Sequence, residues 1–145
     1  MQRYCLLLLS VLVMTGCQKT LRTEGFAVVI PDSVEVTKQS PVEDFDLYVF
    51  GLRGQPFLSA YAGNQPSFPP AQTNGPSRAV ETDKTINGCP SRTVVLTREG
   101  GLPESHVLVH LRTKGWPEFL HFWYTHNSPA QTSLADAIIS SAKPE

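Results

Sequence analysis

The sequence predicts one α+β domain, in which an antiparallel sheet of about six to eight strands carries a C-terminal amphipathic helix on one face. Apolar runs are short and are interrupted by turn residues, since the 145 residues include 12 prolines and 10 glycines. A helical period appears only near the C-terminus, at 129–142. The length suits a single hydrophobic core.

The N-terminal half of the domain is predicted to be a series of short strands. Residues 26–30 form an apolar run closed by Pro31, and residues 33–38 alternate between apolar and polar. Residues 47–50 and 57–62 are two further apolar runs, separated by a turn that contains glycine. We expect these last two runs to form an antiparallel hairpin.

The C-terminal half is predicted to contribute four more strands. Two of them, at 80–86 and 93–97, are separated by an Asn-Gly turn signal. The other two, at 106–111 and 118–124, are the most apolar segments of the domain. They are therefore the expected centre of the sheet.

A two-residue turn at Gly115 and Trp116 would fix the register of these two central strands. The expected pairs are Leu111–Leu120, Val109–Phe122 and Val107–Tyr124 on one face, with His110–His121 and Leu108–Trp123 on the other. Because Pro117 has no N–H to close such a turn, a wider loop with another register stays open.

The final element is expected to be a helix over 129–142. Ser128 is a good N-cap, and Pro129 suits the first helical position. Pro144 follows the expected end of the helix. The apolar stripe is predicted to comprise Ala130, Leu134, Ala137, Ile138 and Ser141.

The first residues of the chain have the pattern of an export signal. Arg3 is the only charge before an apolar run at 6–14, which is too short to span a bilayer. The run ends in the sequence Val-Met-Thr-Gly-Cys at 13–17, which resembles the lipobox of bacterial lipoproteins. The resemblance implies that Cys17 is acylated and becomes the mature N-terminus, and that Gln18 directs the protein to the outer membrane. An ordinary cleaved secretory signal and an uncut membrane anchor are the alternatives.

The resemblance implies three segments: a lipoprotein signal peptide at 1–16, a lipidated cysteine with a short tether at 17–24, and a single domain at 25–145. The polar tether could extend roughly 25 Å. From the same resemblance, we expect the protein to lie in the cell envelope, anchored by its lipid to the outer membrane and facing the periplasm. The membrane would be contacted only through the lipid.

Charge and cysteine content exclude two classes of protein. The formal net charge is −1 and no basic stretch occurs, so the sequence predicts no nucleic-acid partner. Of the three cysteines, Cys5 lies in the signal and Cys17 is expected to carry lipid. Cys89 is then left alone, which excludes an intrachain disulfide framework. We expect Cys89 to be buried.

The expected pairing of His110 with His121 is the one arrangement with metal-like chemistry. Two imidazoles on one sheet face could share zinc or copper, with His106 or His126 nearby. The sequence names no third ligand. The alternative is a pair of histidines on the partly exposed face of a sheet, and the sequence predicts no metal site and no cofactor.

Two aromatic residues are candidates for contact with a partner. Phe68 lies between prolines in the loop at 65–79, and Trp116 lies at the expected hairpin tip. Exposed aromatic side chains at such positions are typical of protein-binding sites. The alternative is that both side chains fold back and cover the second face of the sheet.

The sequence contains no nucleophile elbow, phosphate-binding glycine loop, HExxH motif or paired CxxC motif. It therefore predicts a non-catalytic envelope lipoprotein that offers its domain to an unidentified envelope protein near the membrane. The alternatives are a periplasmic ligand- or metal-binding domain and, third, a small hydrolase. The helix ending Ala-Asp-Ala-Ile-Ile-Ser-Ser-Ala-Lys at 135–143, after an extended strand and a sheet, loosely resembles small periplasmic Mog1/PsbP-like α+β domains.

Overall fold

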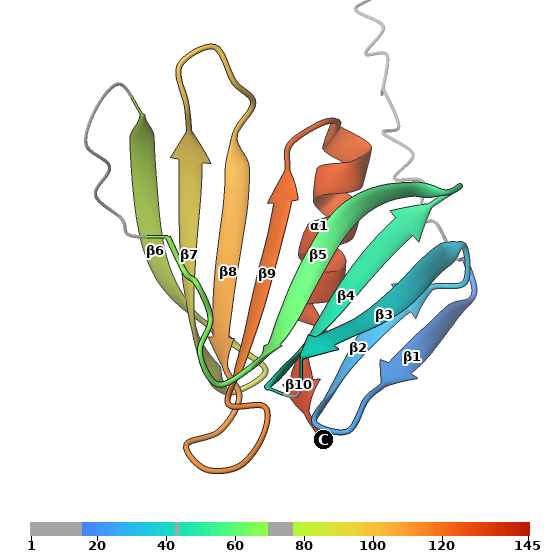
Figure 1. Ribbon diagram of the computed structural model, residues 1–145. Coiled ribbons are helices and arrows are strands. Elements are labelled where there is room, and N and C mark those ends of the chain that lie inside the picture. The colour runs from blue at the N-terminus through green and yellow to red at the C-terminus, as the bar shows by residue number, and fades with distance from the viewer. Residues whose placement is uncertain (1–15, 43, 70–76) are drawn as a thin grey trace, which may run out of the picture.

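The computed structural model describes residues 16–42, 44–69 and 77–145, and these residues form ten strands and one helix (Figure 1). The predicted signal peptide, apart from Gly16, and part of the proline-rich loop lie outside the described residues. The elements are β1 (Gln18–Arg22), β2 (Phe26–Pro31), β3 (Val34–Val42), β4 (Phe45–Leu52), β5 (Gln55–Gly63), β6 (Arg78–Ile86), β7 (Cys89–Thr97), β8 (Glu104–His110), β9 (Phe119–Thr125), α1 (Pro129–Ser140) and β10 (Lys143–Pro144).

The strands form two antiparallel sheets. The main sheet has seven strands in the order β3-β4-β5-β9-β8-β7-β6, and a smaller sheet has the order β1-β2-β10. The predicted antiparallel sheet with a C-terminal helix is confirmed. The small second sheet was not predicted, and because more than half of the described residues lie in strands, the term α+β describes the fold only loosely.

The helix and the small sheet cover the same face of the main sheet. In Figure 1, α1 lies behind β5 and β9, and β2 lies beside β3 and β4. Side chains alternate along a strand, so β9 directs Leu120, Phe122 and Tyr124 to this covered face, which we call the inner face. His121 and Trp123 point to the opposite, outer face.

The hydrophobic core lies between the inner face and its cover. Phe50 and Phe122 are completely buried, and Phe26 of β2 contacts Tyr48 of β4 edge to face, with ring centroids 5.3 Å apart. Burying one such aromatic side chain contributes about 1.5–3 kcal/mol. Cys89 at the start of β7 joins this core as a free thiol, which confirms its predicted burial.

The helix starts as predicted, and its buried stripe differs from the prediction. Ser128 is the N-cap, and its Oγ accepts a hydrogen bond from the backbone N–H of Gln131 at 3.2 Å. The buried helical residues are Ala135, Ile138 and Ile139, whereas Ala130 and Ala137 are exposed. The stripe is rotated because α1 packs against β2 as well as the main sheet. The helix has 12 residues, and no helix in the described part of the chain could cross a membrane.

The polar segment after Cys17, expected to be a tether, instead contains strand β1. Five residues of β1 pair antiparallel with β2, and Leu21 packs against the core. The backbone N–H of Asp32 also donates to the carbonyl of Cys17 at 3.0 Å. The segment is ordered because it completes the hydrogen bonding of β2 along one edge. The folded domain therefore begins immediately after Cys17.

The expected register of the two central strands is wrong by two residues. Val107 pairs with Phe122 and Leu108 with His121, so the predicted pairing of His110 with His121 does not occur. The connection is wider than a two-residue turn, because the N–H of Leu111 donates to the carbonyl of Glu118 at 2.8 Å. A shift of two residues leaves every side chain on its predicted face.

Candidate binding cleft

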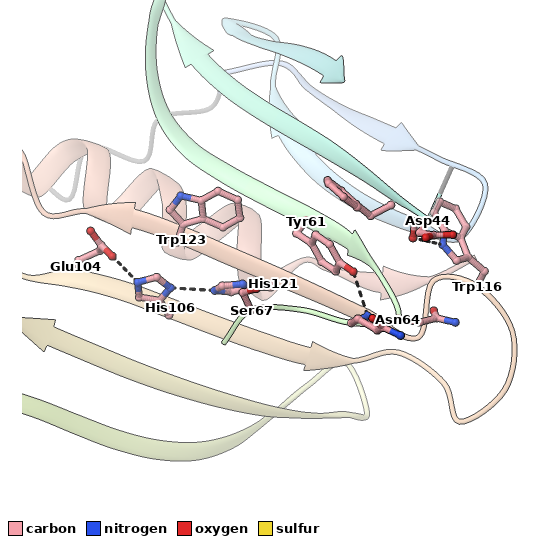
Figure 2. A pocket seen from close by; sticks show the side chains of 11 residues that line it. Asp44, Tyr61, Asn64, Ser67, Glu104, His106, Trp116, His121 and Trp123 are labelled. Carbon is pink, nitrogen blue, oxygen red and sulfur yellow. Dashed lines mark hydrogen bonds and ion pairs between the residues drawn. The ribbon is translucent and has the colours of Figure 1, made fainter. Parts of the chain in front are cut away.

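A cleft of about 890 Å³ opens on the outer face of the main sheet (Figure 2). Its floor is formed by β5, β8 and β9, and its rim by the segment after β5 and the loop between β8 and β9. The residues that line it are Asp44, Phe45, Tyr61, Asn64, Gln65, Ser67, Glu104, His106, Trp116, His121 and Trp123.

Strand pairing explains why these side chains come together. Tyr61 of β5 pairs with His121 of β9, and Trp123 of β9 pairs with His106 of β8. All four side chains therefore point to the outer face in adjacent positions. At the end of β5, Tyr61 also contacts Phe45, with ring centroids 5.2 Å apart. The floor is thus a continuous aromatic and imidazole surface.

The two histidines form a hydrogen-bonded chain with Glu104. His106 Nδ1 lies 2.9 Å from His121 Nε2, and His106 Nε2 bonds to the Glu104 carboxylate. His121 is only 5% exposed. Its burial, and then the nearby charge of His106, lower the pKa of His121 to about 4. His121 is therefore neutral at pH 7 and serves as a hydrogen-bonding group in the floor.

Phe68 folds back onto this histidine pair. Its ring meets His121 and His106 edge to face, with centroid distances of 5.4 and 6.5 Å. The side chain is half-buried. Phe68 therefore covers part of the outer face, which is the alternative considered for it, and it contributes an apolar wall next to the cleft.

Trp116 forms part of the rim at the other end of the cleft. Its indole N–H donates to the backbone carbonyl of Asp44 at 3.4 Å, and its side chain is half-buried. The same loop is held by Asn64, whose Oδ1 accepts a hydrogen bond from the N–H of Glu118 at 2.9 Å. Two side chains that the sequence singled out, Phe68 and Trp116, thus lie on the same face of the sheet.

His110 lies outside the cleft. It stacks on Phe119, with ring centroids 4.8 Å apart, and its Nε2 is 3.4 Å from the Glu118 carboxylate. The pairing of His110 with His121 as metal ligands is therefore wrong, because the register places Leu108 opposite His121. Within the described ranges, no group of three or more His, Cys, Asp or Glu side chains has the arrangement of a metal site.

A serine–histidine pair on the inner face does not offer a catalytic site. Ser105 Oγ lies 2.8 Å from His126 Nε2, which is the distance expected of a nucleophile and its base. Ser105 is only 3% exposed, so a substrate cannot reach its hydroxyl. His126 also stacks on Tyr124, with ring centroids 5.3 Å apart. We interpret this pair as part of the packing between β9 and the start of α1.

The sequence did not identify most of the residues that line the cleft. The sequence predicts only that Tyr61 and Trp123 lie in apolar strands, and it gives Glu104 no role. The available signal was their alternation: they occupy the positions that point away from the inner face. The correct register of β8 and β9 was required to group them.

No protein-family model matches this chain, and a search of curated proteins found no match. The function has to be inferred from the chemistry of the cleft and from the position of the cleft relative to Cys17.

Proposed function

We propose that this chain is a lipid-anchored, non-catalytic binding domain of the bacterial cell envelope, and that the cleft on its outer face binds an envelope protein. The lipid is attached at Cys17, and Gln18 directs the protein to the outer membrane. The domain faces the periplasm and presents the cleft to its partner.

The observation that carries the proposal is the aromatic cleft itself. Trp116, Trp123, Tyr61 and Phe45 line it, and each of these side chains is half-buried. Tryptophan and tyrosine are the residues most enriched among those that dominate protein-binding energies. An open aromatic cleft of this kind is typical of an interaction site, because a monomer that needs no partner gains stability by covering such side chains.

The position of Cys17 supports the proposal. Cys17 is exposed and adjoins the turn between β2 and β3. In this turn, the backbone N–H of Asp32 donates a hydrogen bond to the carbonyl of Cys17. β3 begins there at Val34, which pairs with Leu52 at the end of β4. The end of the cleft at Phe45 and Trp116 lies near the start of β4, roughly 25 Å from Val34 along the strand, whereas the end at Trp123 and Glu104 lies toward Leu52. A lipid on Cys17 would therefore hold the domain against the membrane with the Phe45 and Trp116 end of the cleft directed away from the membrane.

A second candidate function is the binding of a small ligand in the same cleft. The volume of about 890 Å³ lies within the range of small-molecule sites. A neutral His121 and the amides of Asn64 and Gln65 could orient such a ligand by hydrogen bonds.

The anchor is tested by lipid labelling in the native cells. We expect globomycin to block processing of the chain, and palmitate to label the native protein and not the Cys17→Ala variant. The variant should leave the membrane fraction. Unchanged membrane association of Cys17→Ala would contradict the anchor.

The cleft is tested by affinity capture from detergent-solubilised envelopes. We expect the native chain to retain a specific protein that Trp123→Ala and Trp116→Ala retain at least tenfold less, the loss typical of a central binding residue. Thr37→Ala is the matched control, because Thr37 is exposed on the outer face of β3, away from the cleft. Equal capture by all variants would contradict the proposal. Capture of a small ligand alone, identified by native mass spectrometry, would favour the second candidate.

A further inference from the structure

We propose that the cleft recognises lysine or arginine side chains on an extended segment of its protein partner. This inference rests on the proposed function, because it names the chemistry of the partner that occupies the same cleft. The charge of the cleft, the placement of its indole rings and its open shape support the inference in turn.

The charge of the cleft favours a cation. Its eleven lining residues include two carboxylates, Asp44 and Glu104, and no lysine or arginine. The whole chain, in contrast, is nearly neutral, with 12 basic and 13 acidic residues. In the described part of the chain the Asp44 carboxylate forms no ion pair, whereas Glu104 bonds to His106. An anionic partner would meet a carboxylate at each end of the cleft and no lysine or arginine.

Each carboxylate lies near an indole ring. Figure 2 shows Trp123 and Glu104 at one end of the cleft, Trp116 and Asp44 at the other, and Tyr61 between them. The face of an indole attracts ammonium and guanidinium groups more strongly than any other aromatic side chain does. A ring and a carboxylate together bind a cation through two different interactions. The cleft repeats this combination at its two ends, so it suits a partner with two separated cationic groups.

The shape of the cleft favours a peptide segment over a free amine. A small-molecule site buries 70–90% of its ligand. Here the cleft lies open on a sheet face, and Asp44, Asn64, Gln65 and Ser67 on its rim are all exposed. An occupant would keep one side in solvent, as the backbone of a peptide does when its side chains point into a groove.

The test measures binding of defined peptides to the full chain in detergent. The probes are fluorescent, N-acetylated and C-amidated decapeptides of glycine and serine that carry two lysines or two arginines at varied spacing. Matched peptides carry glutamine or glutamate at the same positions. We expect the basic peptides to bind at least tenfold more tightly than the glutamine peptides, with an affinity that falls as salt is raised. The glutamate peptides should not bind.

Variants of the two carboxylates test the assignment of the site. We expect Asp44→Asn and Glu104→Gln each to weaken basic peptides about tenfold without changing the melting temperature by more than a few degrees. Glu35→Gln is the matched control, because Glu35 is an exposed carboxylate on β3 outside the cleft, and it should leave binding unchanged.

Several outcomes would overturn the inference. These are equal binding of lysine and glutamine peptides, binding that survives both carboxylate substitutions, and no binding of any peptide at millimolar concentration. Tighter binding of spermidine than of every peptide would assign the cleft to a free polyamine instead. If envelope capture is lost in Trp123→Ala and kept in both carboxylate variants, the proposed function stands and the inference fails. If capture survives Trp123→Ala as well, both fail.

Discussion

The two faces of β9 differ in what covers them. Phe122 points to the inner face, where α1 and β2 bury it completely. Trp123, the next residue along the chain, points to the outer face and stays partly exposed in the cleft beside His121. One strand therefore supplies both the centre of the core and the floor of the cleft.

The difference separates residues that stabilise the fold from residues that are free to bind. On the inner face, apolar side chains exclude water and contribute to the free energy of folding. On the outer face, hydrogen bonds join His106 to both Glu104 and His121. The rings of Tyr61 and Trp123 stay accessible in the cleft. We therefore expect substitutions on the inner face to reduce stability and those on the outer face to reduce binding.

Phe122→Ala should have the largest effect on stability. Removing a completely buried aromatic side chain leaves a cavity and costs about 3–5 kcal/mol of unfolding free energy. Guanidinium titration followed by circular dichroism measures this cost. Trp123→Ala is the matched control on the adjacent residue, and we expect it to cost less than Phe122→Ala because the Trp123 side chain is only partly buried. Equal costs for the two variants would break the distinction between the faces.

His121 is a buried titratable group of the outer face, and it should make stability depend on pH. The unfolded chain binds a proton at His121 below about pH 6.5, and the folded chain does so only near pH 4. The neutral His121 therefore contributes about 2–3 kcal/mol to the unfolding free energy above pH 6.5, and this contribution is lost as the pH falls toward 4.

The matched measurement is the unfolding free energy of the native chain and of His121→Gln between pH 4 and 7. The unfolding free energy of the variant should depend less steeply on pH, because the variant lacks the contribution of His121. The other titratable groups of the cluster, His106 and Glu104, are present in both proteins. Parallel curves for the two proteins would contradict the burial of a neutral His121.

Tyr124 provides a smaller test on the inner face. Its hydroxyl donates to the Asp136 carboxylate and so links β9 to α1. Burial, and then this hydrogen bond, raise the pKa of Tyr124 to about 12. Tyr124→Phe should cost about 1–2 kcal/mol in thermal or chemical unfolding, because a hydrogen bond to a charged group is lost. Stability of the native chain should also fall above pH 10, where unfolded Tyr124 ionises first. A Tyr124→Phe variant as stable as the native chain would show that the link is not formed in solution.

His110→Ala should have the smallest effect. Its side chain is partly exposed, and the Glu118 carboxylate lies 3.4 Å from its Nε2 without forming a hydrogen bond, so we expect a loss of about 0.5 kcal/mol or less. Envelope capture should be unchanged, because His110 lies outside the cleft. His106→Ala, which removes the link between Glu104 and His121, should reduce capture. A loss of capture in His110→Ala equal to that in His106→Ala would mean that the binding surface extends beyond the cleft.

The fold was largely predictable from the sequence because its strands alternate strongly and its helix has a clear N-cap. The apolar runs around Val49, Val95 and Val109 predicted their strands, and Ser128 with Pro129 predicted the start of α1. Strand β1 was missed because its polar residues pair only with the edge of β2, and pairing of this kind leaves no apolar period in the sequence.

The cleft was not predictable, because it depends on long-range register. His106 and His121 meet only when the connection around Trp116 is wider than a two-residue turn. The sequence contains Pro117, which argued for a wider loop, and does not specify its width. Trp116 and Phe68 were identified as conspicuous aromatic side chains. The carboxylates of Asp44 and Glu104 come from separate segments and are brought to one cleft only by the folded sheet.

The most direct test of the central claim is photo-cross-linking from the floor of the cleft in the native cells. A photoreactive benzoylphenylalanine replaces Tyr61, whose side chain lines the cleft, or Thr37, which is exposed on the same face outside it. We predict a discrete cross-linked envelope protein from position 61 that is absent from position 37. The same product from both positions, or no product from position 61, would contradict the claim that the outer face of this sheet is a binding surface.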